Sequence, residues 1–182
     1  MKKKNSKVIL DKKGFSQAIV RMTDEIAGKN KDKRGLSKLA IIGIRTRGEH
    51  IARRIVDLIK RKYKSNVPLG VLDITLYRDD LTTISAHPIV RSTEIPFDIN
   101  GKNIVLVDDV LYTGRTIRAA MDEVVDFGRP RNIQLAIIVD RGLREFPIQG
   151  DYVGVSLATK QSQNVEVRLE ESEGRDEIVL VG

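Results

Sequence analysis

The chain has 182 residues, a formal net charge of +7 and no cysteine. This length suits one domain with a full hydrophobic core, and the lack of cysteine excludes a disulfide framework, a thiolate nucleophile and a cysteine-based zinc site. There is no apolar run long enough to cross a bilayer and no signal-peptide core, so we expect a cytoplasmic protein. The basic excess suits anionic ligands such as phosphates or RNA, although it equally describes a surface biased for solubility.

The first third of the chain predicts a strand, a helix, a second strand and a second helix. A short strand over Lys7–Leu10 is followed by Asp11, a suitable N-cap for a helix from Lys12 to Ala27. The apolar run Leu39–Ile44 predicts a buried strand, and the stretch from Glu49 to Tyr63 has helical periodicity.

The remainder continues this alternation. We predict strands at Val67–Leu76, Ile104–Val107 and Ile133–Val139, a helix over Ile117–Val125, and short strands and turns from Tyr152 onward. Alternating strands and helices indicate an α/β fold, with a doubly wound, mainly parallel central sheet flanked by helices. In such sheets ligands bind where the carboxyl ends of the strands meet.

One stretch combines several features of a sugar-phosphate site. The apolar run Ile104–Val107 leads into Asp108 and Asp109, and the turn Thr113–Thr116 precedes a helix. Backbone N–H groups and hydroxyls at a helix N-terminus suit a phosphate, and two carboxylates suit ribose hydroxyls or Mg²⁺. The alternative is a capping Thr113 beside solvated loop charges. Because the features occur as an ordered set, we favour a ribose 5-phosphate site.

The loop Gly43–Gly48 is a second candidate phosphate site. It resembles a nucleotide P-loop, but Glu49 stands where that motif requires lysine, and we reject this interpretation. One interpretation of the loop is a basic turn that simply leads into a helix.

The stretch from Tyr77 to Pro96 is too long and polar to be an ordinary connection in a compact domain. One interpretation of this stretch is a disordered surface insertion. Neither His50 nor His87 has a second histidine or a cysteine at metal-binding spacing.

The strand, acidic pair and Thr-Gly turn together resemble the phosphoribosyl diphosphate (PRPP) signature of the type I phosphoribosyltransferases. The resemblance implies a small hood, built from the N-terminal strand and residues after about 140, over one domain spanning residues 1–182. It assigns catalysis to Asp108, Asp109, Arg47 and the lid residue Arg78, and Mg²⁺ binding to Asp108 and Asp109. It makes Gly43–Gly48 a diphosphate-binding loop that uses Arg47, and it makes Tyr77–Pro96 a loop that closes over PRPP. It also implies that the Arg45-Thr46 peptide bond can be cis. The implied PRPP-binding residues are Arg45, Thr46, Arg47, Gly48, Asp108, Asp109, Val110, Leu111, Tyr112, Thr113, Gly114, Arg115 and Thr116.

Longer motifs resemble a narrower group, the pyrimidine operon attenuation proteins that are also uracil phosphoribosyltransferases. These motifs are residues 73–81, 107–116, 127–130 and 139–145. The group implies conversion of uracil and PRPP to UMP and diphosphate, with Val139, Asp140 and Arg141 lining the base pocket. Purine-specific relatives usually carry aspartate where this chain has Tyr112, which disfavours a purine. No residue is a convincing general base.

The same resemblance implies binding of a leader-RNA hairpin when UMP or UTP is bound, and a homodimer or higher homo-oligomer. Candidate RNA-binding residues are Arg21, Arg141, Arg144 and Lys160. The chain departs from the usual pattern at Val20, at Asp24 and over residues 154–160, and an added carboxylate repels RNA phosphates. Two alternatives therefore stay open: a uracil phosphoribosyltransferase without RNA recognition, and an enzyme for another base such as guanine, hypoxanthine or orotate.

Overall fold

A computed structural model describes residues 6–74 and 92–182. Its centre is a five-stranded sheet in which every neighbouring pair is parallel. The spatial order is β3 (Leu69–Leu72), β2 (Leu39–Ile44), β4 (Asn103–Leu111), β5 (Asn132–Asp140) and β6 (Tyr152–Ser156). The predicted doubly wound α/β fold is confirmed.

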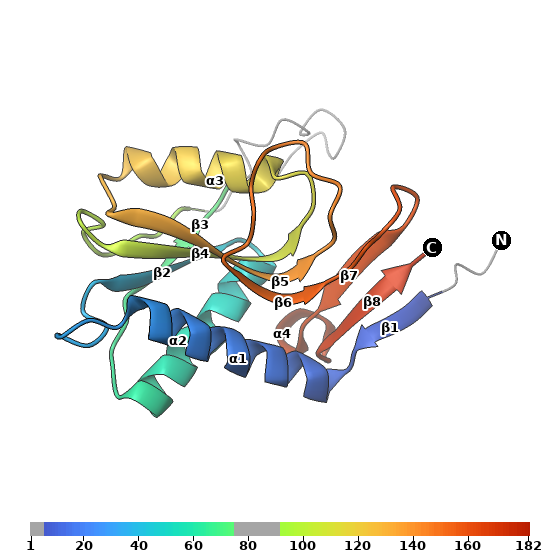
Figure 1. Cartoon of the computed structure of the whole chain (residues 1–182), viewed down its shortest axis with the longest axis horizontal. Helices are drawn as coiled ribbons and strands as arrows, with labels where there is room; N and C mark the ends of the chain where they lie inside the picture. Colours follow the sequence, from blue (N-terminus) through green and yellow to red (C-terminus); the bar gives the residue numbers. More distant parts are fainter. Residues whose placement is uncertain (1–5, 75–91) are drawn as a thin grey trace.

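Helices cover both faces of this sheet (Figure 1). Helices α1 (Lys12–Asn30) and α2 (Arg47–Tyr63) lie on one face, and α3 (Arg115–Asp126) lies on the other. Successive strand residues point to opposite faces, so Val105 packs with the α1 and α2 side chains whereas Leu106 packs with those of α3. Strands buried on both faces explain the near-continuous apolar runs in the sequence.

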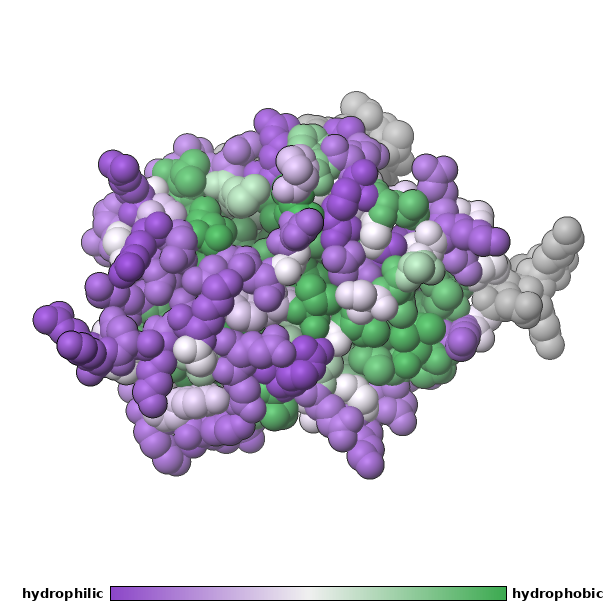
Figure 2. Space-filling model, in the orientation of Figure 1, coloured by the Kyte–Doolittle hydropathy of each residue, from purple (hydrophilic) through white to green (hydrophobic). Residues whose placement is uncertain are grey.

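A second, three-stranded antiparallel sheet lies at one end of the molecule (Figure 1). We call it the hood sheet; its order is β1 (Ser6–Leu10), β8 (Glu177–Val181) and β7 (Asn164–Arg168), and the short helix α4 (Glu170–Glu173) joins β7 to β8. The face in Figure 2 is mostly hydrophilic, with apolar residues gathered near the hood sheet and the C-terminal end of α3. Residues 152–156, which we expected in the hood, instead form β6 of the central sheet.

Several element boundaries differ from the predicted ones. Helix α1 continues to Asn30, whose side chain donates to the carbonyl of Ile26 inside the helix. Strand β4 extends to Leu111, so Asp108 and Asp109 lie within the strand and not after its end. Tertiary pairing explains this, because β5 runs beside β4 along its whole length.

Part of the predicted loop from Tyr77 to Pro96 lies outside the described residues, and Arg78 is among those left out. At its end, Glu94 forms a backbone bridge with Val71 of β3. Among the helices of the described residues, none is both long and apolar enough to span a membrane.

Candidate active site

The site lies where the sheet changes winding direction. The chain leaves β2 into α2 on one face and leaves β4 into α3 on the other, so the connections diverge between these two neighbouring strands. A cavity of about 210 Å³ opens there. It is lined by Ile44, Arg45, Thr46, Arg47, Ile74, Asp108, Asp109, Val110 and Thr116. The two segments predicted to bind diphosphate and ribose therefore meet in one cavity.

Close packing of α2 on the sheet requires glycine at two positions. A Cβ atom on Gly48 would lie 2.3 Å from the carbonyl oxygen of Val107, and one on Gly43 would lie 2.7 Å from the Cα of Glu49. The absence of side chains thus lets the start of α2 touch β4, next to Asp108. The peptide bond between Arg45 and Thr46 in this loop is cis.

A larger cavity of about 430 Å³ lies beside the turn that precedes α3. Its lining includes every residue from Asp109 to Ile117, together with Arg141, Glu145, Asn164 and Val165. Gly114 occupies the N-cap position with φ +93°, and the N–H of the first helical residue, Arg115, donates to Thr113 Oγ1 at 3.3 Å. The positive end of the α3 dipole faces this cavity and favours a phosphate there.

Asp109 is the residue common to three cavities, because it also lines one of about 280 Å³ with Arg47, Glu173 and residues 164–168. Its carboxylate accepts a hydrogen bond from the Val110 N–H at 2.8 Å. Burial raises the pKa of Asp109, and the positive charge of Arg47 opposes that rise. Asp108 is only 7% exposed, and one of its oxygens accepts from the Asp109 N–H.

Two arginines bring positive charge to the smaller cavity. Arg45 lies between two carboxylates: Nη2 is 3.2 Å from Glu94 Oε1, and Nε is 3.7 Å from Glu49 Oε2. This buried Nε has no hydrogen-bond acceptor among the described residues. Arg47 Nη2 lies 2.7 Å from Glu173 Oε1. Both guanidinium groups retain N–H donors that a diphosphate can use.

Arg141 is the one predicted base-binding residue that lines the larger cavity. Its guanidinium stacks on the Tyr112 ring, 4.2 Å from the ring centroid, and donates to Thr159, Lys160 and Gln163. Val139 is buried within β5, and the Asp140 carboxylate accepts from the Gly142 N–H, so neither side chain lines that cavity. The structure therefore leaves Val139 and Asp140 to act, if at all, through their backbone.

Arg144 forms several polar contacts inside the fold. Its guanidinium donates to the carbonyls of Tyr112 and Ile148 and pairs with Asp140. Arg141 is 5% exposed, and the Arg144 side chain is 21% exposed. Several N–H donors of both arginines are thus used inside the fold, which leaves fewer of them for RNA phosphates. Sequence reasoning could not separate such arginines from surface ones.

The other predicted RNA-binding residues are exposed. Arg21 donates to the carbonyls of Val153 and Gly154, and Lys160 lies in the exposed loop that follows β6. The carboxylate of Asp24 pairs with Lys62 at 2.6 Å and accepts a hydrogen bond from Tyr63, and these contacts lower the pKa of Asp24. The Lys62 charge therefore partly compensates the carboxylate that we expected to repel RNA.

Four residues near the site were not among the predicted site residues, although Glu145 ends the motif at 139–145. Glu145 pairs with Arg115 at 2.6 Å, Asn164 and Val165 come from the hood sheet, and Glu173 pairs with Arg47. The ion pair also alters the expectation for Arg115, whose charge is met partly by Glu145. All four residues reach the site from segments distant in the chain, so only tertiary structure brings them there.

The carboxylates fit Mg²⁺ only in company with a phosphate ligand. Among the described residues no group of three or more histidine, cysteine or acidic side chains could hold a metal by itself. Asp108 and Asp109 supply two carboxylates beside a cavity. Mg²⁺ is commonly held by one or two carboxylates, substrate phosphates and water, and this pair fits that arrangement.

Known proteins agree with this geometry. The family described as the phosphoribosyl transferase domain matches residues 6–172, which is nearly the whole chain. The chain belongs to this family. It is 51% identical over 173 residues to the Bifunctional protein PyrR of Pelotomaculum thermopropionicum, covering 95% of this chain and 94% of that protein. It is 54% identical over 164 residues to the PyrR of Thermus thermophilus, covering 90% and 89%. Within the phosphoribosyltransferases it is therefore a member of the PyrR group.

Solved phosphoribosyltransferases have the same fold at low identity. A hypoxanthine phosphoribosyltransferase from Trypanosoma cruzi, in complex with IMP, superposes with a TM-score of 0.74 at 15% identity over 100% of this chain and 96% of its own. A hypoxanthine-guanine phosphoribosyltransferase from Bacillus anthracis gives 0.71 at 14% identity, covering 97% of this chain and 98% of that one. At such identities the likeness concerns the fold alone.

Proposed function

We propose that this PyrR-group protein is a cytoplasmic uracil phosphoribosyltransferase, converting uracil and PRPP to UMP and diphosphate. The observation that carries the proposal is the position of Asp109, where three cavities meet between the Arg45–Gly48 loop and the turn before α3. PRPP has a diphosphate, a ribose with two hydroxyls and a 5-phosphate. The three parts of this site match them in the same order.

Each part of the site has a physical role in the proposed reaction. Arg47 and the loop backbone hold the diphosphate that leaves, and the turn at residues 113–116 holds the 5-phosphate. Asp108 and Asp109 accept hydrogen bonds from the ribose hydroxyls. As the bond from C1′ to the diphosphate breaks, positive charge develops on the sugar ring, and a fixed carboxylate stabilises it. Catalysis then rests on orientation and electrostatics, with the role of general base left unassigned.

Asp108 and Asp109 are also the residues that we propose to hold Mg²⁺ together with PRPP. When bound, the ion would neutralise charge on the diphosphate and so improve it as a leaving group.

The base would lie in the larger cavity near Tyr112 and Arg141. Stacking on Tyr112 fixes the guanidinium of Arg141, and the loop carbonyls that it binds fix the shape of this wall. Tyr112 stands where purine-specific relatives usually have an acid, which favours uracil over a purine.

Replacement of the central carboxylate tests the site. We expect Asp109→Asn to reduce diphosphate release by about 100-fold or more, since charge stabilisation at the sugar is lost while the side-chain shape is kept. Asp122→Asn is the matched control, because Asp122 is an exposed residue of α3, with a side chain 62% exposed. Comparable activity in Asp109→Asn and wild type would contradict the assignment.

A substrate panel tests the base. Diphosphate release is measured with PRPP and Mg²⁺ in the presence of uracil, orotate, guanine or hypoxanthine. Of the four bases, we expect only uracil to support diphosphate release. Turnover of guanine or hypoxanthine in its place would support the alternative of a phosphoribosyltransferase for another base.

We also propose regulation of pyrimidine operon transcription through nucleotide-dependent binding of leader RNA. Two observations support this second activity. The relatives are named Bifunctional protein PyrR, and the basic residues Arg21 and Lys160 are exposed. Arg21 contacts Gly154, so the two segments considered for RNA binding adjoin each other. The proposed assembly is a homodimer or larger homo-oligomer, which sedimentation analysis tests.

Gel shifts with UMP or UTP present test RNA recognition. We expect a pyrimidine-operon hairpin to bind more tightly than a scrambled hairpin, and binding to weaken as salt rises because phosphate contacts release counterions. Equal binding of both hairpins would leave a uracil phosphoribosyltransferase without RNA-regulatory activity.

A further inference from the structure

The arginine assigned to diphosphate is already held by a carboxylate from the hood. Arg47 Nη2 donates to Glu173 Oε1 at 2.7 Å, across 126 positions of sequence. The two side chains are partly exposed, at 43% for Arg47 and 28% for Glu173. Both line the cavity of about 280 Å³ that Asp109 also lines, so the pair forms part of the wall of the site.

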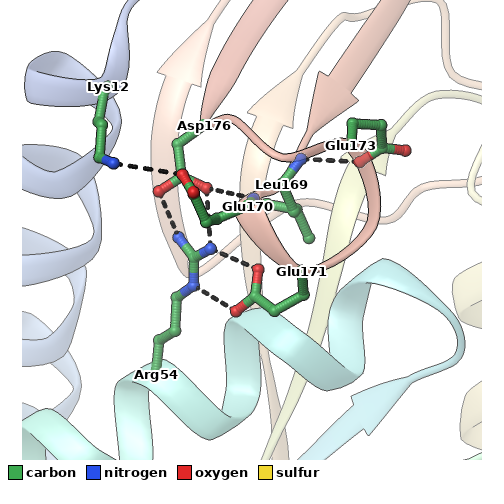
Figure 3. Close-up of polar contacts among 7 residues, drawn as sticks. All are labelled: Lys12, Arg54, Leu169, Glu170, Glu171, Glu173 and Asp176. Carbon is green, nitrogen blue, oxygen red and sulfur yellow. Dashed lines mark hydrogen bonds and ion pairs between the residues drawn. The ribbon is translucent and has the colours of Figure 1, made fainter.

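Glu173 is itself fixed by a second contact. Its other oxygen, Oε2, accepts the Leu169 N–H at 2.8 Å (Figure 3). The pKa of Glu173 is lowered mainly by this backbone hydrogen bond, with a contribution from Arg47. Glu173 is thus an ionised side chain with both oxygens in use, and such a carboxylate gives Arg47 a defined direction.

Ion pairs connect the segment around α4, which carries Glu173, to helices α1 and α2. Arg54 of α2 donates to both Glu171 and Asp176, and Lys12 of α1 pairs with Glu170 (Figure 3). The Arg54 contacts join α2, which begins at Arg47, to the segment around α4. Both ends of the contact between Arg47 and Glu173 are therefore anchored to the same helix.

Arg47 lies on the boundary between two cavities. It lines the cavity of about 210 Å³ with Asp108 and the cavity of about 280 Å³ with Glu173, and Asp109 lines both. One guanidinium nitrogen binds Glu173, and no other hydrogen bond of this guanidinium occurs within residues 6–74 and 92–182, so its remaining donors can bind an anion. An unrestrained arginine would have to lose more side-chain freedom on binding the same anion.

We infer that Glu173 is a positioning residue, which holds Arg47 in the orientation that binds the diphosphate of PRPP. This inference rests on the proposed function and extends it to a hood residue. Glu173 touches neither reacting atoms nor substrate in this account. Its effect passes through Arg47 and should vanish when Arg47 is absent.

A double-mutant cycle between Glu173→Ala and Arg47→Ala tests the inference. The measurements are the KM for PRPP, kcat, and the affinity for diphosphate with Mg²⁺ by calorimetry. We expect Glu173→Ala to weaken diphosphate binding and raise the KM by about tenfold, with kcat changed by no more than about twofold. In the Arg47→Ala background, adding Glu173→Ala should change either quantity by less than about twofold.

Two further variants separate positioning from stability. Glu173→Gln keeps an oxygen acceptor for Arg47, so its diphosphate affinity should lie between those of Glu173→Ala and wild type. This variant provides the test should Glu173→Ala fold poorly. Glu170→Ala is the matched control, because Glu170 lies on the same helix and its carboxylate pairs with Lys12 rather than Arg47. It should leave the KM for PRPP at the wild-type value.

The inference would be overturned if Glu173→Ala weakened diphosphate binding equally with and without Arg47, or if Glu170→Ala raised the KM for PRPP as much as Glu173→Ala. Neither result would contradict the proposed enzyme activity. Failure of the wild-type protein to bind either PRPP or diphosphate would overturn the proposed function, and the inference with it.

Discussion

At the scale of single residues, two glycines differ in whether their surroundings would admit a side chain. Gly48 lies against the Val107 carbonyl, where an added Cβ would approach to 2.3 Å, whereas Gly28 of α1 has nothing within 4 Å of its Cβ position. The first glycine lets the Arg45–Gly48 loop approach β4. The second has no steric requirement.

We therefore expect opposite effects of alanine at these positions. Gly48→Ala should destabilise the fold by about 1–3 kcal/mol, because backbone atoms must move apart, and should raise the KM for PRPP. Gly28→Ala should stabilise it by up to about 1 kcal/mol, since alanine loses less entropy in a helix. Thermal denaturation and steady-state kinetics measure both effects. Equal melting temperatures for the two variants would contradict this reading of the packing.

At the scale of elements, a buried polar network holds α1 against the sheet. Asn30 at the end of α1 donates to Gln134 of β5 and to the Tyr152 hydroxyl of β6, and that hydroxyl donates to Gln134. Burial raises the pKa of Tyr152 to about 12. Because each buried polar group is satisfied, the network fixes how the helix and two strands pack together.

The Tyr152→Phe variant should be less stable at neutral pH by about 0.5–1.5 kcal/mol, the usual net value of a buried hydrogen bond. The pKa of Tyr152 is raised on folding from 10.0 to about 12, so its contribution is full below pH 10 and is lost as pH rises toward 12. Urea unfolding at about pH 8 and about pH 11 should show the difference between wild type and variant shrinking at the higher pH. A difference that grows with pH would contradict the prediction.

At the scale of the whole molecule, charged contacts fasten the hood sheet to the central domain. The hydrogen bonds from Arg54 lower the pKa of Glu171. For Asp176, burial alone would raise the pKa, but the hydrogen bonds from Arg54 and from the Glu170 N–H outweigh it and leave it lowered. The Asp176 side chain is 11% exposed, so removal of Arg54 would leave a poorly solvated charge.

Arg54→Met should cost about 1–3 kcal/mol at neutral pH. Both carboxyl pKa values are depressed on folding from 4.5 and 3.8, so the wild-type contribution is present above those values and is lost as pH falls below them. The difference in stability between wild type and Arg54→Met should therefore narrow in acid, as unfolding curves at about pH 7 and about pH 3 would reveal. Lys12→Met is the control: its pair with Glu170 is exposed, and its loss should cost less than about 1 kcal/mol. A difference that stays constant with pH would argue against this role of Arg54.

The amino-acid sequence by itself determined the order of elements, the faces of the helices, and the succession of apolar strand, acidic pair and Thr-Gly turn at residues 104–116. These features follow from periods of two and 3.6 residues and from short motifs, so neighbouring residues suffice to specify them. Only the tertiary structure decided that Glu173 holds Arg47, that Arg141 and Arg144 are committed within the fold, and that residues 152–156 join the central sheet. Such contacts join positions up to more than a hundred residues apart, and they depend on which strand ends and helices meet in space. Local sequence patterns do not specify these long-range contacts.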